Sequence, residues 1–331
     1  MNGAGYSMKL YRLGAFNHWI TALLLAFAVA SPASAQIKML TIMAPAAPGG
    51  GWDQTSREMQ KVMEENHLAN GAKVVNVPGA GGTIGLAQFV NANKGKSDVL
   101  MTMGLIMVGA VLTNQSPVAL RQVTPIARLT GEYEVLVVPE ASPFKSLGEF
   151  IEAWKQDPGK YAIGGGSAGG TDHMLAGLLA KSVGIDVTKI NYIPHSGGGE
   201  SIASLVGNHL PVGVNGLAEM VPFIKTGRLR ALAISSEKQL PGLDIPTFVE
   251  QGADLTLANW RGVVAPPGIS AQQRAALMDV VDRMVKTAGW KAVLEKNDWI
   301  DMYQSGPEFD EFLKQEDIRV TAVLKSIGLV K

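Results

Sequence analysis

From residue 38 onward, short apolar segments alternate with longer amphipathic ones. In the longer segments, apolar residues recur at a spacing of three and four, as at Met59, Val62 and Met63, which is typical of one buried helix face. The short segments predict strands at residues 40–44, 73–77, 98–103, 134–138, 161–164, 190–193, 211–214, 229–234 and 262–265. This alternation predicts an α/β fold in which mostly parallel sheets are flanked by helices.

Glycine-rich turns follow several of the predicted strands. They occupy residues 48–51, 78–82, 164–170 and 196–199. In parallel α/β sheets such turns lie at the carboxyl ends of the strands, where these folds bind ligands. Glycine allows positive φ and lets a ligand approach the backbone. We therefore expect at least two of these loops to contact a ligand.

The first glycine loop opens a helix that Asp53 or Thr55 can cap. Free amides at a helix start, together with the positive end of the helix dipole, form an anion site without a basic side chain. Because none of the glycine loops contains Lys or Arg, the sequence predicts that backbone amides hold an anion. Gly50→Val should then harm binding more than removal of any basic side chain. Trp52 is expected either to wall the pocket or to pack in the core.

The loop at 164–173 matches two enzyme motifs. Gly164-x-Gly166-x-x-Gly169 fits a dinucleotide fingerprint, but Asp186 comes before the next strand instead of at its end. The spacing around Ser167 also fits a nucleophile elbow. No histidine follows His209, which leaves little room for a later acid and base. A nucleotide site is therefore disfavoured, and a secreted serine hydrolase using Ser167 stays an alternative.

The composition excludes other chemistry. The 331 residues include no cysteine, so thiolate metal sites, iron–sulfur clusters, cysteine nucleophiles and lipid attachment through an N-terminal cysteine are excluded. His173, His195 and His209 lack the spacing of a metal site. No cofactor, metal or catalytic residue is predicted. The net charge is zero, and the absence of long runs of like charge argues against a nucleic-acid partner.

The N-terminal residues 1–35 have the pattern of a signal peptide. Lys9 and Arg12 precede an uncharged apolar run at 20–30, and Ala33-Ser34-Ala35 provides a small-x-small cleavage motif. The alternative, a membrane anchor, is disfavoured because the run is short for a bilayer core of about 30 Å. We expect cleavage after Ala35 and a soluble mature protein in the periplasm.

Six segments in one order resemble the substrate-binding receptors of tripartite tricarboxylate transporters, the Bug-type periplasmic proteins. The segments are PAAPGGGWDQTSR, VPGAGGTIGL, GGGSAGGTDHMLAGLLA, YIPHSGGGES, GRLRALAIS and WRGVVAPPGIS. The likeness runs from about residue 38 to the C-terminus. Trp52-Asp53 and Asp172-His173 look closest to the citrate-receptor branch.

The resemblance implies two α/β lobes with the ligand cleft between them, each lobe a mostly parallel sheet flanked by helices. Residues 36–133 and 259–331 would form lobe 1 and residues 134–258 lobe 2. The crossing segments near 131–138 and 258–264 are hinge candidates. Ligand carboxylates would be held by backbone amides and ordered waters. The implied ligand set is Pro48, Gly49, Gly50, Trp52 and Asp53 against Ser167, Gly169, Thr171 and His173, with Gly197, Gly198 and Asn215 as weaker members.

Within this set, Asp53 is expected to cap the helix rather than meet an anion, because two carboxylates repel. The implied function is a monomeric periplasmic receptor, not an enzyme, that binds a small di- or tricarboxylate and delivers it to a membrane permease. A ligand-binding module for a sensor kinase is a further alternative, since nothing in the sequence separates transport from sensing.

Overall fold

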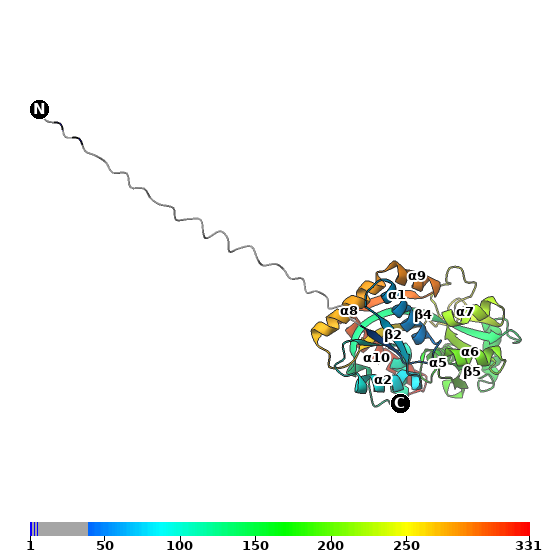
Figure 1. Ribbon diagram of the computed structural model, residues 1–331. Helices are drawn as coiled ribbons and strands as arrows, with labels where there is room; N and C mark the ends of the chain where they lie inside the picture. The colour runs from blue at the N-terminus through cyan, green and yellow to red at the C-terminus, as the bar shows by residue number, and fades with distance from the viewer. Residues whose placement is uncertain (2, 4, 6–38) are drawn as a thin grey trace. The chain divides into compact units, whose positions relative to one another are not determined.

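The computed structural model describes residues 39–331, together with residues 1, 3 and 5 (Figure 1). The predicted signal peptide and its cleavage site lie outside the described residues. Within the described part of the chain, no helix combines the length and apolar character needed to cross a membrane. Strands and helices alternate along it, which confirms the predicted α/β fold.

All nine predicted strands form, most of them shifted by one or two residues. The strands are β1 (Leu40–Ala44), β2 (Ala72–Asn76), β3 (Val99–Gly104), β4 (Thr124–Pro139), β5 (Ile163–Gly165), β6 (Tyr192–Pro194), β7 (Val212–Gly216), β8 (Leu229–Ile234), β9 (Ala258–Ala265) and β10 (Ile300–Ser305). The sequence prediction missed β10 and the first ten residues of β4. Both carry polar residues between the apolar ones, so neither stands out as a short apolar run.

The helices cover the sheet and begin at recognisable caps. They are α1 (Gly51–Glu65), α2 (Thr83–Ala92), α3 (Leu105–Thr113), α4 (Leu147–Gln156), α5 (Thr171–Ser182), α6 (Gly198–Val206), α7 (Leu217–Lys225), α8 (Ala271–Val285), α9 (Ala288–Lys296) and α10 (Gly306–Ser326). Ser146, Ser270 and Thr287 accept backbone N–H groups at the starts of α4, α8 and α9. By contrast, the glycines that precede α1, α5 and α6 provide no side-chain cap.

The strands form a mixed sheet in the order β2-β1-β3-β9-β4-β7-β5-β6, with β8 and β10 also pairing with β4. The outer strands are parallel: β1 pairs with β2 and β3, and β5 pairs with β6 and β7. All partners of β4 are antiparallel to it. The predicted parallel pairing therefore occurs in the outer regions, and the strands that connect them run antiparallel.

Strand β4 belongs to two groups of strands. Residues 124–133 pair with β9, and part of this stretch also pairs with β10. Residues 134–139 pair with β7 and β8. We call β1, β2, β3, β9 and β10 the first strand group and β5 to β8 the second strand group. Hydrogen bonding is continuous between the groups through β4, and the lobe boundaries inferred from the sequence stay a prediction.

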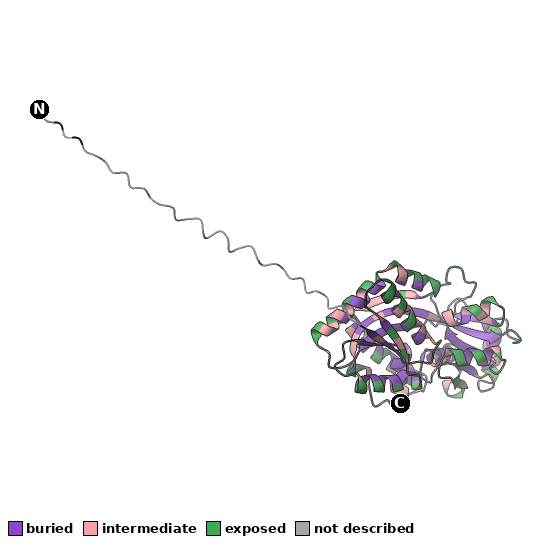
Figure 2. Cartoon of the chain, viewed as in Figure 1, coloured by how far each residue is buried: buried purple, intermediate pink, exposed green. Residues whose placement is uncertain are grey.

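The core lies on both faces of this sheet, as the buried strands between exposed helix faces show (Figure 2). Side chains alternate along β4, as expected for a strand. Val135 and Val137 pack with Leu217 of α7 in one cluster, whereas Leu136 packs with Met174 of α5 in another. The second of these clusters includes residues from both strand groups, so the loops at the strand ends are held on a shared core.

Candidate functional site

A cavity of about 70 Å³ lies at the strand ends, between loops of both strand groups. Its walls include residues that follow β1, β5 and β6, so it occupies the carboxyl ends of parallel strands, as predicted. The lining residues are Pro45, Ala46, Gly50, Gly51, Trp52, Gly81, Gly82, Ile106, Glu132, Gly166, Ser167, Asp172, Ser196, Gly197, Gly198, Gly216, Glu219, Asn259 and Arg261.

Several helices begin at this cavity, α2 among them through its N-cap residue Gly82. The residues just before α1, α6 and α7 are Gly50, Gly197 and Gly216, and all three line it without offering a side-chain cap. Asp172 in the first turn of α5 lines it as well. Helix starts carry partial positive charge and unpaired N–H groups. The local structure therefore favours negative groups at this place.

Five residues of the predicted ligand set line the cavity. They are Gly50, Trp52, Ser167, Gly197 and Gly198. Trp52 meets both expectations for it, because it walls the cavity and is also only 6% exposed within the main core cluster. The loops from both strand groups thus meet here, as the resemblance implied.

Asp53 is turned away from this cavity. Its carboxylate accepts N–H groups from Gly49, Arg57 and Asn76. Burial opposes its ionisation, but these hydrogen bonds outweigh burial and hold the pKa of Asp53 below its usual value. The N-cap prediction for Asp53 and Thr55 is wrong, because the N-cap residue of α1 is Gly50, three residues before Asp53. Asp53 instead fixes the turn before the helix.

Several other predicted residues shape the loops behind the cavity. The His173 Nδ1 atom accepts the N–H of Gly169 at 3.2 Å, and its ring stacks on Tyr192 at a centroid distance of 4.0 Å. Burial lowers the pKa of His173 to about 4, so the ring is neutral at physiological pH. Thr171 Oγ1 bonds Asn259 Oδ1 at 3.1 Å. These contacts hold the 166–173 loop against its neighbours.

The remaining members of the predicted set, Pro48, Gly49 and Asn215, also lie outside the lining. Asn215 is buried on β7, and neither atom of its side-chain amide has a hydrogen-bond partner. The ligand set inferred from the resemblance therefore falls into two parts, one at the cavity and one behind it.

Charged side chains that the sequence prediction missed also line the cavity. Glu132 and Arg261 form an ion pair, and the two residues are only 1% and 3% exposed. Both come from the strands β4 and β9, not from the glycine loops. The available signal was a charge inside an apolar strand, because charged residues are almost never fully buried unless they are paired. A cation is thus present at the site although no glycine loop contains one.

Glycines make room for these charges. A Cβ atom on Gly51 would clash with the guanidinium of Arg261, and one on Gly216 would clash with the carboxylate of Glu132. A Cβ atom on Gly198 would likewise clash with the carboxylate of Glu219. Gly50, in contrast, has φ −80°, and its nearest neighbour would be 3.5 Å from an added Cβ. Gly50→Val therefore requires no forbidden backbone conformation, and its expected effect on binding stays a prediction; Gly51 is the tightly packed position.

Three further carboxyl groups gather beside the ion pair: Glu134, Asp172 and Glu219. Asp172 accepts the N–H of Gly166 at 2.5 Å, and Glu219 accepts the N–H of Gly51. Burial raises the pKa of Asp172 to about 6. Burial, and secondarily the charge of Asp172, raises the pKa of Glu219 to about 7.

Glu134 is the most deeply buried of the three. Its carboxyl group is hydrogen-bonded to the side-chain amide of Asn259 and to the carboxyl group of Asp172. Burial, followed by the charges of Asp172 and Glu219, raises the pKa of Glu134 well above its usual value. On the cationic side, burial lowers the pKa of Arg261 to about 9. Burial thus raises the pKa of every one of these three carboxyl groups and lowers that of Arg261.

The geometry gives no support to hydrolysis or metal binding. No histidine in residues 39–331 bonds Ser167 Oγ, and His195 instead contacts Gly165 O and Ser204 Oγ. In the same residues, no group of three acidic, histidine or cysteine side chains is placed to hold a metal ion.

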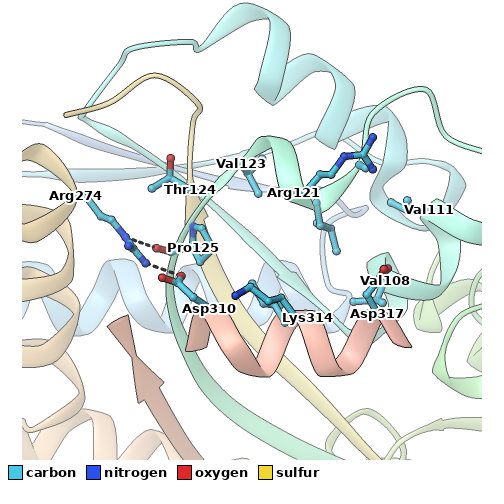
Figure 3. Close-up of a pocket in the computed structure, with 13 residues that line it drawn as sticks. Val108, Val111, Arg121, Val123, Thr124, Pro125, Arg274, Asp310, Lys314 and Asp317 are labelled. Atoms are coloured by element: carbon cyan, nitrogen blue, oxygen red, sulfur yellow. Dashed lines mark hydrogen bonds and ion pairs between the residues drawn. The ribbon is translucent and has the colours of Figure 1, made fainter. Parts of the chain in front are cut away.

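A second concavity lies away from the glycine loops, between η2 (Leu120–Gln122), the start of β4 and α10 (Figure 3). Its volume is about 560 Å³. Arg274 reaches Asp310 at 2.7 Å and the Pro125 carbonyl at 3.0 Å, as the dashed lines show. We call it the α10 groove. No residue of the predicted ligand set lines it.

Comparisons with known proteins agree with this picture. The family described as tripartite tricarboxylate transporter family receptor matches residues 55–329. Protein BugT of Bordetella pertussis is 29% identical over 248 residues, which cover 72% of this chain and 75% of that protein.

Two solved structures share the two-lobed fold. The periplasmic binding protein BugD superposes with a TM-score of 0.80 at 20% identity, over 89% of this chain and 99% of that chain. MatC of Rhodopseudomonas palustris superposes with a TM-score of 0.76 at 22% identity, over 87% and 99%. Because the family match spans most of the sequence, the chain belongs to the tripartite tricarboxylate transporter receptor family.

Proposed function

We propose that this protein is an exported periplasmic receptor that binds a small di- or tricarboxylate in the cavity and delivers it to a membrane permease. The observation that carries the proposal is the convergence of uncapped helix starts from both strand groups on one small cavity. Arg261 adds a buried cation to those amides. The solved structure of MatC contains malate, a dicarboxylate, which agrees with this ligand class.

In this proposal the chain is exported by the signal peptide at 1–35, acts as a monomer and performs no covalent chemistry. The ligand closes the two strand groups on each other by hinge bending at the crossing segments near 131–138 and 258–264. Contacts across the cleft support such closure: Thr113 Oγ1 of α3 donates to Ala168 O at 3.3 Å. Citrate is one candidate ligand, because of the resemblance to the citrate-receptor branch.

A thermal-shift screen followed by calorimetry tests the proposal. The probes are malate, succinate, adipate and citrate, with chloride and sulfate at matched ionic strength as controls. A ligand that binds only the folded protein raises its melting temperature. We expect at least one carboxylate to do so where the inorganic anions do not.

Two matched variants locate the binding. Gly197 lines the cavity with extended backbone and open space at its Cα, so Gly197→Val should fold normally and fill the cavity. Gly199 has equally open space but does not line the cavity. We expect Gly197→Val to abolish the ligand-induced shift and Gly199→Val to retain it. Equal binding by the two variants would place the ligand elsewhere.

A further inference from the structure

Helix α3, which follows β3 of the first strand group, packs directly on the 166–170 loop, which follows β5 of the second strand group. Gly109 and Thr113 lie one turn apart on α3 and therefore on the same face of the helix. A Cβ atom on Gly109 would clash with the carbonyl oxygen of Gly169, and one on Gly169 would clash with the Thr113 side chain. The two backbones approach so closely here that no side chain fits between them.

The second strand group holds the loop in the shape that this contact requires. The N–H of Gly169 donates to His173 Nδ1 at 3.2 Å, and the His173 ring stacks on Tyr192. The Tyr192 hydroxyl in turn donates to the carbonyl oxygen of Gly166 at 2.8 Å. Gly169 has a φ of +73°, a conformation that favours glycine. The loop is therefore positioned against α3 by residues of its own strand group.

This contact is separate from the ligand cavity. In the described part of the chain, the cavity lining includes none of Gly109, Thr113 and Gly169. Gly109 and Gly169 are buried, and Thr113 Oγ1 donates to the carbonyl oxygen of Ala168 at 3.3 Å. Its packing and its hydrogen bond join the two strand groups without the participation of a ligand.

We propose that Gly109, Thr113 and Gly169 form a closure contact, which stabilises the closed arrangement of the two strand groups and so sets the affinity for every ligand by the same factor. The inference rests on the proposed function and on its hinge closure. A ligand that binds only the closed arrangement has an apparent Kd equal to its intrinsic Kd divided by the closed fraction. A change in that fraction alone weakens all ligands equally, whereas a change in the cavity alters the preference among them.

Gly109→Ala tests the closure contact. Alanine is a better helix former than glycine, so α3 itself should stay intact. The added methyl group fits only when Gly169 moves away, which favours the open arrangement. We expect calorimetry to show roughly tenfold or greater losses of affinity for both malate and adipate, with the ratio of the two affinities unchanged within about twofold.

Gly148→Ala is the matched control. It makes the same substitution in α4, at an exposed glycine whose added Cβ would lie 3.9 Å from its nearest neighbour, Ser146 Oγ. Both affinities should be retained. Thr113→Val keeps the shape of the side chain and removes the hydrogen bond to Ala168, so both affinities should fall by about three- to tenfold. If circular dichroism shows that Gly109→Ala does not fold, Thr113→Val decides.

A distance measurement tests the closure contact without a ligand. The chain has no cysteine, so Glu65→Cys at the end of α1 and Lys225→Cys at the end of α7 accept spin labels selectively. Both residues are exposed, and their helices border one concavity of about 540 Å³. With no carboxylate added, Gly109→Ala should shift the distribution of label distances towards longer values, and Gly148→Ala should not.

The outcomes separate the two proposals. An unchanged distance distribution in Gly109→Ala overturns the closure contact, whether or not a carboxylate binds. Wild-type affinity in Gly109→Ala, or losses that differ severalfold between malate and adipate, also overturn it and leave the carboxylate receptor standing. If no carboxylate of the thermal-shift screen binds the wild type, the proposed function fails, and the distance distributions alone decide on the closure contact.

Discussion

The small cavity at the glycine loops and the α10 groove differ in how they carry charge. The groove is about eight times larger, at about 560 Å³ against about 70 Å³. Its pair Arg274–Asp310 is only partly buried, with side chains 28% and 33% exposed. In the cavity the side chains of the pair Arg261–Glu132 are 4% and 1% exposed, and three unpaired carboxyl groups lie nearby. Charge, and not volume, therefore distinguishes the cavity that we propose as the ligand site from the α10 groove.

Burial explains this difference. An exposed ion pair is solvated whether or not it forms and contributes about 0–1 kcal/mol. Burying an ion pair requires desolvation free energy, and each additional buried acid adds to this unfavourable term. Perturbed ionisable groups of this kind gather at functional sites. The cavity retains charges that the folded protein would be more stable without, which is expected of a site kept for a ligand.

The largest expected effect is the loss of folding stability when the buried arginine of the cavity is replaced. Arg261→Met leaves Glu132 buried without a counter-ion and should lower the free energy of unfolding by about 3–5 kcal/mol. Arg274→Met loses a partly exposed pair and the hydrogen bond to Pro125, which predicts a loss of about 1–2 kcal/mol. Urea unfolding of the two variants measures both.

The double variant Arg261→Met with Glu132→Gln is the control for the first prediction. It removes the charge left behind, so it should recover part of the stability that Arg261→Met loses. Equal losses for the two arginine variants would mean that the buried pair is no more important to folding than the one in the α10 groove.

The second prediction concerns pH. The pKa of Glu219 is raised to about 7 in the folded protein, so the folded state holds a proton that the unfolded state releases near pH 4.5. The stabilisation that this bound proton provides is complete below pH 4.5 and is lost as the pH rises through 7. Asp172, raised to about 6, acts in the same direction.

The free energy of unfolding of Glu219→Gln, measured relative to the wild type, should therefore rise by about 1–2 kcal/mol between pH 4.5 and pH 7.5. This figure takes solvent screening into account. The control is Asp310→Asn in the α10 groove, whose difference from the wild type should not grow in this way. Unfolding free energies at four pH values between 4.5 and 8 measure the slopes. Parallel slopes for Glu219→Gln and the wild type would contradict the raised pKa.

The sequence predicted the fold, and which loops meet at the cavity, for clear physical reasons. Apolar periodicity depends on local burial, so strands such as β1 and β8 were placed with the correct ends. The glycine loops were expected at the carboxyl ends of strands, and all four, at 48–51, 78–82, 164–170 and 196–199, contribute to the cavity wall. Both results rest on short-range patterns that one sequence displays.

The charges of the site could not be predicted in the same way. Glu132 and Arg261 lie 129 positions apart and meet only because β4 and β9 are paired. The role of Gly51 could not be predicted for the same reason: it leaves space for the Arg261 side chain from β9, not only for a ligand. The helix start at Gly51 was missed because glycine favoured a turn there and Asp53 looked like a cap.

The third prediction concerns one hydrogen bond. Ser167 lines the cavity, so its hydroxyl is placed to meet a ligand there. Ser167→Ala should weaken carboxylate binding by about 0.5–1.5 kcal/mol, or up to about 3 if the ligand group is charged. Calorimetry measures this with the best carboxylate of the screen. Lys314→Ala in the α10 groove is the control and should bind as the wild type does.

The smallest expected effect is the salt dependence of stability, which should differ between the ion pair of the α10 groove and that of the cavity. Asp310→Asn removes the partly exposed pair with Arg274, at an expected cost of about 0.5–1 kcal/mol at low ionic strength. The Debye length falls from about 30 Å at 0.01 M to about 3 Å at 1 M, so added salt should erase most of that cost. The pair of Arg261 and Glu132 is almost wholly buried and so poorly screened, and the loss in Arg261→Met should stay nearly constant over the same range. Urea unfolding of both variants at 0.02 M and 0.5 M sodium chloride measures the two dependences. If the loss in Arg261→Met shrank with salt as the loss in Asp310→Asn does, ions would have access to the cavity pair, and charge there would be no more significant than charge in the α10 groove.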